Sequence, residues 1–107
     1  MRKIILLLFF LSFQSHAGIE VDRIWSEGNF GYALVTYANT TGKTFNTAVT
    51  IKCVAMGKNK KILGVNEGSF FTHQHGPIKP GFSDTIEIPF QLNGAKMKSA
   101  KCSYSER

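Results

Sequence analysis

The run NTAVTIKCVAMG, residues 46–57, constrains the fold of this chain more than any other stretch. Its apolar side chains recur at every second position, and the positions between them include Thr50 and Lys52. Because side chains alternate between the two faces of a β-strand, this spacing predicts a strand with one face turned toward a core. The residues that this phase places in the core are Val49, Ile51, Cys53 and Ala55.

Several further runs show the same alternation between turn residues. FSDTIEIPF places Phe82, Ile86, Ile88 and Phe90 on one face, and Pro89 predicts an edge strand because proline cannot donate to a ladder. No stretch of useful length has a helical period. About six to seven short strands separated by turns predict an all-β fold, a small antiparallel immunoglobulin-like β-sandwich. The last strand, KSAKCSYS, holds Ala100, Cys102 and Tyr104 in one phase.

Two earlier runs complete the predicted strands. IEVDRIWS places Ile19, Val21 and Trp25 on one alternating face. NFGYALVTYAN is rich in aromatic and β-branched residues and leads into the turn NTTGK. Asn39 in that turn also begins a glycosylation sequon, but a hairpin turn explains the same residues without a glycan.

The chain contains two cysteines, Cys53 and Cys102. Both fall in the apolar phase of their strands, so both thiols are expected to point into one core. A disulfide between them would close a loop of about 50 residues, which the chain-entropy model values at about 4 kcal/mol. No Cys-x-x-Cys spacing suggests a redox-active pair, so a structural bridge is predicted.

The opening MRKIILLLFFLSFQSHAG has the pattern of a secretory signal peptide. Arg2 and Lys3 precede an apolar run, and Ser15 and Ala17 supply small residues at the −3 and −1 positions of a cleavage site. Residues 1–17 are therefore predicted to be removed, leaving a single domain over residues 18–107. The apolar run is shorter than the roughly 20 residues of a membrane span. An exported protein of the periplasm or the extracellular space, with no membrane span after cleavage, is expected.

The charge balance limits the partners. The formal net charge is +6, and removal of the leader would leave eleven basic and seven acidic residues. Lys58, Lys60 and Lys61 form a cluster in one predicted turn. Export argues against a nucleic-acid partner, so an acidic protein or an anionic envelope surface remains.

The run FTHQHGPIKPG, residues 71–81, holds His73 and His75 between turn-forming prolines and glycines. In an extended segment the two imidazoles would point the same way and could begin a zinc or copper site. Two ligands fall short of the four that a closed zinc site needs, and an irregular connection into the next strand explains the run without a metal. No cofactor is expected.

Part of the chain resembles FxLYD-type and related small immunoglobulin-like bacterial envelope domains. Asn39, Thr41 and Gly42 match the first turn of that pattern, and residues 57–61 take the place of its second turn. Residues 78–90, IKPGFSDTIEIPF, match its Pro-Gly turn and the strand that follows. The resemblance covers about residues 32–90 and implies an immunoglobulin-like sandwich with a binding role.

Three functional hypotheses follow. The first is a small exported binding or accessory protein of the cell envelope that acts through protein–protein contacts, without catalysis. The second is a periplasmic metal-binding protein that uses His73 and His75. The third, a small secreted hydrolase, lacks a Gly-x-Ser-x-Gly motif and a recognisable carboxylate pair. The interaction surface expected for the first hypothesis consists of Phe70, Phe71, Lys58, Lys60 and Lys61.

Export gives the first testable prediction. Protein recovered from the envelope or the medium of cells that express the full chain should begin at Gly18, because Ser15 and Ala17 match the small residues of a cleavage site. N-terminal sequencing checks this. An intact Met1 in the exported fraction would contradict it.

Overall fold

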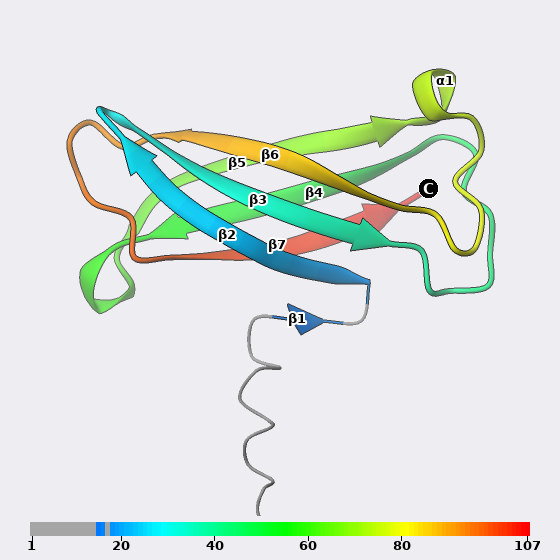
Figure 1. Cartoon of the computed structure of the whole chain (residues 1–107), viewed down its shortest axis with the longest axis horizontal. Coiled ribbons are helices and arrows are strands. Elements are labelled where there is room, and N and C mark those ends of the chain that lie inside the picture. The colour runs from blue at the N-terminus through cyan, green and yellow to red at the C-terminus, as the bar shows by residue number, and fades with distance from the viewer. Residues whose placement is uncertain (1–14, 17) are drawn as a thin grey trace, which may run out of the picture.

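The computed structural model describes residues 15–16 and 18–107, so the predicted signal peptide lies outside the described residues except for a two-residue strand. Two antiparallel sheets pack face to face, with strand orders β1-β2-β3-β6 and β5-β4-β7 (Figure 1). The predicted all-β antiparallel sandwich with one disulfide is confirmed. The strands are β1 (Ser15–His16), β2 (Ile19–Glu27), β3 (Phe30–Ala38), β4 (Ala48–Met56), β5 (Ile62–Phe71), β6 (Ser83–Gln91) and β7 (Ser99–Glu106).

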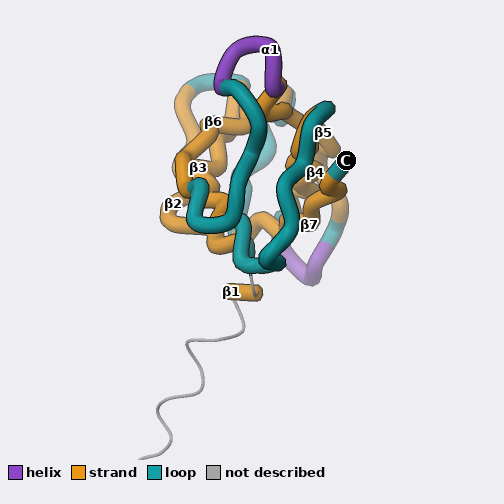
Figure 2. Tube along the Cα trace, turned by 90° about the vertical axis from the view of Figure 1, so that its right-hand side faces the viewer, coloured by secondary structure: helices purple, strands orange, loops and turns teal. Residues whose placement is uncertain are grey.

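The core lies where the alternation placed it. β4 buries all four residues of its predicted apolar phase. β6 is the last strand of its sheet, as Pro89 predicted. Viewed end-on, the two sheets form separate layers, and long connections cross between them at one end (Figure 2). The side chains that fill the space between the layers include Ala33, Val35 and Tyr37 from β3, Ile88 and Phe90 from β6, and Val49, Ile51, Cys53 and Ala55 from β4.

A β-bulge changes the predicted phase of β2. The register of β2 against β3 shifts between Val21 and Arg23, and one extra residue reverses the faces of the side chains that follow it. Ile24 therefore packs against the core. Trp25 stacks instead on its register partner Tyr32, with ring centroids 5.3 Å apart. The prediction that Trp25 shares the core face of this strand is wrong.

The connection from β3 to β4, residues 39–47, crosses from one sheet to the other, so the predicted hairpin turn is also wrong. Asn39, only 3% exposed, holds this connection. Its Nδ2 donates to the carbonyl oxygens of Lys43 at 2.7 Å and Ile78 at 3.1 Å. Its Oδ1 accepts hydrogen bonds from the N–H and the hydroxyl of Thr41. These bonds join the connection 39–47 to the connection that contains Ile78. They also occupy the amide nitrogen to which a glycan would attach.

The predicted disulfide is confirmed. Cys53 on β4 and Cys102 on β7 lie directly opposite each other, with Cα atoms 4.1 Å apart. Their exposed fractions are 0% and 7%, so the bridge lies in the core. It joins neighbouring strands of the same sheet and fixes the register of β7 against β4.

Tyr37 ties the two sheets together near the end where the connections cross. Its ring lies against those of Phe70, Phe82 and Tyr104, with centroids 5.6 to 6.3 Å away. Its hydroxyl donates to Glu106 Oε2 on β7 at 2.6 Å. Burial, together with this hydrogen bond, raises the pKa of Tyr37 above its ordinary value, so the hydroxyl remains a donor.

Asn39 generates the second testable prediction. Asn39→Asp should lower the free energy of unfolding by about 3 kcal/mol, because it removes two donated hydrogen bonds and turns a carboxylate toward two carbonyl oxygens. Urea denaturation measures the change. Asn46→Asp makes the same chemical change at an exposed position of the same connection and should stay within about 0.5 kcal/mol of the unmodified protein. Equal effects of the two substitutions would contradict the anchoring role of Asn39.

Candidate binding surfaces

The histidine segment begins with a single helical turn, α1 (Thr72–His75), rather than an extended run. Side chains two positions apart on a helix are rotated by about 200° and point apart. His73 stacks on Phe71, with ring centroids 5.4 Å apart. His75 meets Phe70 and Phe82 edge-on, at 5.7 and 6.0 Å. The two imidazoles therefore have different aromatic partners, and the shared face expected from an extended segment is wrong.

The rest of this segment is anchored to the core. Ile78 is fully buried and forms an isolated β-bridge with Phe45, through main-chain hydrogen bonds of 3.0 and 2.9 Å. Gly76 and Gly81 adopt positive φ values of 77° and 92°, which glycine tolerates best. The predicted irregular connection into β6 is confirmed. Within the described residues, no three His, Cys, Asp or Glu side chains cluster as a metal site would require.

The structure does not bring the five predicted contact residues together. Phe70 is only 3% exposed and packs in the core, whereas Phe71 is 42% exposed. Lys58, Lys60 and Lys61 precede β5, and Phe71 ends it. A ten-residue strand is about 33 Å long, so the basic turn and the exposed phenylalanine lie at opposite ends of the sandwich.

A different apolar surface lies on the outer face of the β5-β4-β7 sheet. Val54 pairs with Val65, and Met56 pairs with Ile62. Ile62 and Val65 are 63% and 53% exposed. This surface is not among those predicted from the sequence, although the alternation contains a signal for two of its residues: Val54 and Met56 share the phase of Thr50 and Lys52 rather than that of the core. We call Val54, Met56, Ile62 and Val65 the outer patch.

A second β-bulge completes the outer patch. The register of β4 against β5 shifts between Ala55 and Met56. Leu63 therefore packs against the core, and its neighbour Ile62 lies on the outer face. In the sequence KKILGVN the two aliphatic residues are indistinguishable, so the exposed one could not be chosen without the register.

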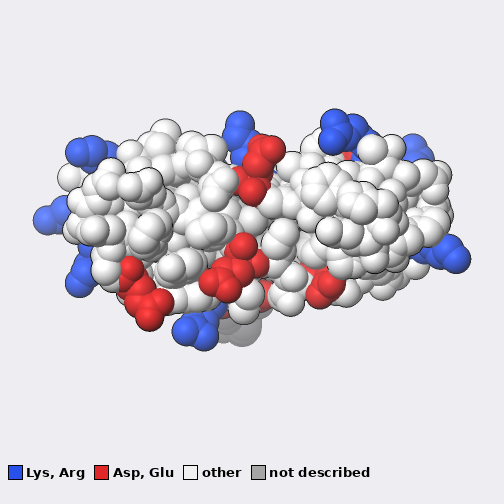
Figure 3. Space-filling view, turned by 90° about the horizontal axis from the view of Figure 1, so that it is seen from above, with Lys and Arg blue, Asp and Glu red and all other residues white. Residues whose placement is uncertain are grey.

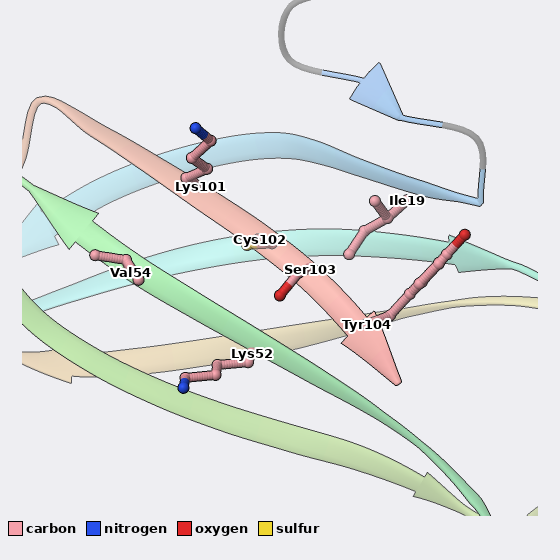
Figure 4. A pocket seen from close by; sticks show the side chains of 7 residues that line it. All are labelled: Ile19, Lys52, Val54, Lys101, Cys102, Ser103 and Tyr104. Carbon is pink, nitrogen blue, oxygen red and sulfur yellow. The ribbon is translucent and has the colours of Figure 1, made fainter. Parts of the chain in front are cut away.

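Two grooves run along the side of the sandwich where β2 approaches β7. Together their linings hold four basic side chains, Lys52, Lys98, Lys101 and Arg23, against one acidic side chain, Asp22. By contrast, the side seen from above carries several acidic groups, most of them near its middle, and basic groups at both ends and along the margins (Figure 3). The larger groove, of about 560 Å³, is lined by Ile19, Lys52, Val54, Lys101, Cys102, Ser103 and Tyr104 (Figure 4).

These grooves do not assemble a familiar catalytic group. Among the described residues that line them there is no histidine, and the larger groove has no carboxylate beside Ser103. A triad of serine, histidine and carboxylate is therefore absent from the described lining of these grooves.

In the described part of the chain, no helix has the length and apolar character of a membrane span. Comparison with family models, with curated proteins and with solved structures found no match to this chain. The resemblance to FxLYD-type domains stays a prediction, and the surfaces themselves are the basis for a functional proposal.

The histidines generate the third testable prediction. His75→Ala should lower the free energy of unfolding by about 1 kcal/mol, because it removes contacts with two aromatic rings, and His73→Ala should cost less. Gln74→Ala, on the exposed part of the same turn, is the matched control. Thermal melts with and without zinc or copper should give the same midpoint. A metal-dependent rise that disappears when both histidines are replaced would restore the metal-binding hypothesis.

Proposed function

We propose that this chain is a small exported binding protein that contacts another protein of the periplasm or extracellular space through the outer patch, without catalysis. The observation that carries the proposal is the pair Ile62 and Val65, both more than half exposed on one face of a sheet. Covering an aliphatic side chain of this exposure contributes about 1 kcal/mol. A face with several such side chains is typical of a contact site.

Charge favours an acidic partner. Lys101 is the register partner of Val54 on β7, and Lys52 lies two residues before Val54 on β4. Lys58, Lys60 and Lys61 lie in the turn that follows Met56. Glu67, opposite Lys52, is an acidic side chain on the same face. An apolar centre with a basic surround complements a protein surface that has an apolar centre and an acidic rim.

Two features support export. The opening residues have the signal-peptide pattern, and the Cys53–Cys102 disulfide is compatible with an oxidising compartment. In such a compartment nucleic acid is not an expected partner. An anionic membrane surface offers the same charge as an acidic protein, so the experiment has to separate these two.

Site-specific cross-linking tests the proposed function. A photo-reactive benzoylphenylalanine at Val65, in cells that export the full chain, should give one discrete protein adduct. The same group at Glu87, exposed on β6 in the other sheet, is the control and should not give that adduct. Ile62→Asp should abolish the Val65 adduct, because it places a negative charge in the patch that faces an acidic partner.

The purified partner should then bind the purified protein with an affinity that falls as salt rises. The proposal fails if Val65 and Glu87 give the same adducts, if neither gives one, or if Ile62→Asp has no effect. Flotation with anionic vesicles, in place of a protein adduct, would assign the patch to a membrane surface.

A further inference from the structure

The free edge of β7 exposes main-chain groups. Within the described chain, β7 pairs with β4 alone. Ala48 and Arg107 exchange both main-chain hydrogen bonds, at 3.1 and 2.9 Å. In an antiparallel ladder such pairs alternate with closer pairs whose N–H and C=O groups point outward. The short Cα separation of 4.1 Å places Cys53–Cys102 in the second kind. The polar main-chain groups of Cys102, and of Ala100 two residues earlier, therefore point away from β4.

On the other long side of the sandwich, where β5 and β6 approach each other, two features hinder the addition of a strand to β6. Pro89 on β6 has no N–H to offer, and its carbonyl oxygen accepts a hydrogen bond of 2.6 Å from Asn66 Nδ2 on β5. A Cβ atom added to Gly68 on β5 would lie 2.7 Å from Ile86 on β6, so these strands pack closely. Natural sheets protect an exposed edge with such devices. The described part of β7 has no proline, and the protecting device that it does carry is the charged side chain of Lys101.

The side chains near this edge suit a strand with two different faces. Toward the sandwich interior, Val21 and Ile24 of β2 and Ala100 of β7 are only half-buried, although they pack on the core. On the outer face lies Lys101, and Lys98 lies in the smaller groove. A strand added to β7 would therefore meet the apolar groups of Val21, Ile24 and Ala100 with one face and the side chain of Lys101 with the other.

We propose that the edge of β7 binds an extended segment of a partner protein as an additional β-strand. The segment would alternate apolar side chains, directed between β2 and β7, with acidic side chains directed to the lysine-bearing face. Its main chain would pair with Ala100 and Cys102. A second copy of β7 fits less well, because it would bring a second Lys101 onto the same face, where like charges repel.

This edge adjoins the outer patch at Lys101 but uses none of its four apolar side chains, so either surface can bind without the other. The probe is a fluorescein-labelled peptide of alternating valine and glutamate, and its control is a peptide of alternating valine and lysine. Both are added to protein purified after export of the full chain. Fluorescence anisotropy measures binding, and hydrogen exchange measures protection of the Ala100 and Cys102 amides.

Three substitutions locate the contact. Ala100→Pro removes one outward N–H without removing a bond to β4, and should weaken binding of the acidic peptide by about tenfold. Ala100→Val keeps that N–H and should bind as the unmodified protein does. Lys101→Glu, at an exposed position that leaves folding intact, should reverse the preference toward the lysine peptide.

The expected result is binding of the acidic peptide alone, with protection of both amides and the responses given above. The inference is overturned if neither peptide binds, if both bind equally, or if Ala100→Pro and Lys101→Glu leave binding unchanged. Binding that is lost in Ile62→Asp but kept in Ala100→Pro would place the peptide on the outer patch and leave the proposed function standing. If sedimentation shows a dimer that Ala100→Pro dissociates, the added strand comes from a second copy of this chain and not from a partner protein, which overturns the inference.

Discussion

The pairing of Cys53 with Cys102 is the constraint on which both proposed surfaces depend. The bridge joins residues 49 positions apart, which the chain-entropy model values at about 4 kcal/mol. β7 has a described strand neighbour on one side only, so its register depends on one ladder and on the burial of its inner face. A slip of one residue would turn Ala100 and Tyr104 to the solvent and Lys101 to the core. The disulfide excludes that slip and so decides which side chains face outward.

The two long sides of the sandwich differ for a physical reason. On one side Pro89, Asn66 and Gly68 bring β6 and β5 into contact and leave little main chain to pair. On the other side, where β2 and β7 approach each other, the half-buried side chains of Val21 and Ile24 line the smaller groove. A small domain buries a limited share of its surface, and part of the apolar remainder lies in the smaller groove and on the outer patch.

Alternation in the sequence predicted the core well, because a strand has a fixed period. The core phases of β4, β6 and β7 followed from it, and the shared phase of the two cysteines supported the disulfide, whereas the edge position of β6 followed from the missing N–H of Pro89. The two bulges could not be predicted in this way, because an inserted residue has no sequence signature. Each bulge reversed the faces of the side chains beside it, so Trp25 lies outside the core and Ile62 lies in the outer patch. The helical turn at His73 begins at Thr72, whose N–H and hydroxyl donate to the carbonyl oxygen of Thr47, a distant contact that no local pattern reveals.

The outer patch and the β7 edge meet at Lys101, whose register partner Val54 belongs to the patch. A strand added to β7 would lie about 10 Å from β4, since neighbouring strands are separated by about 4.8 Å. A partner could therefore place an extended segment on the edge and an adjoining surface on the patch at the same time. Each contact alone is modest, but a short tether holds the second contact at an effective concentration of about millimolar. A rigid, disulfide-fixed sheet also loses little freedom on binding, so two weak surfaces suffice for a specific partner.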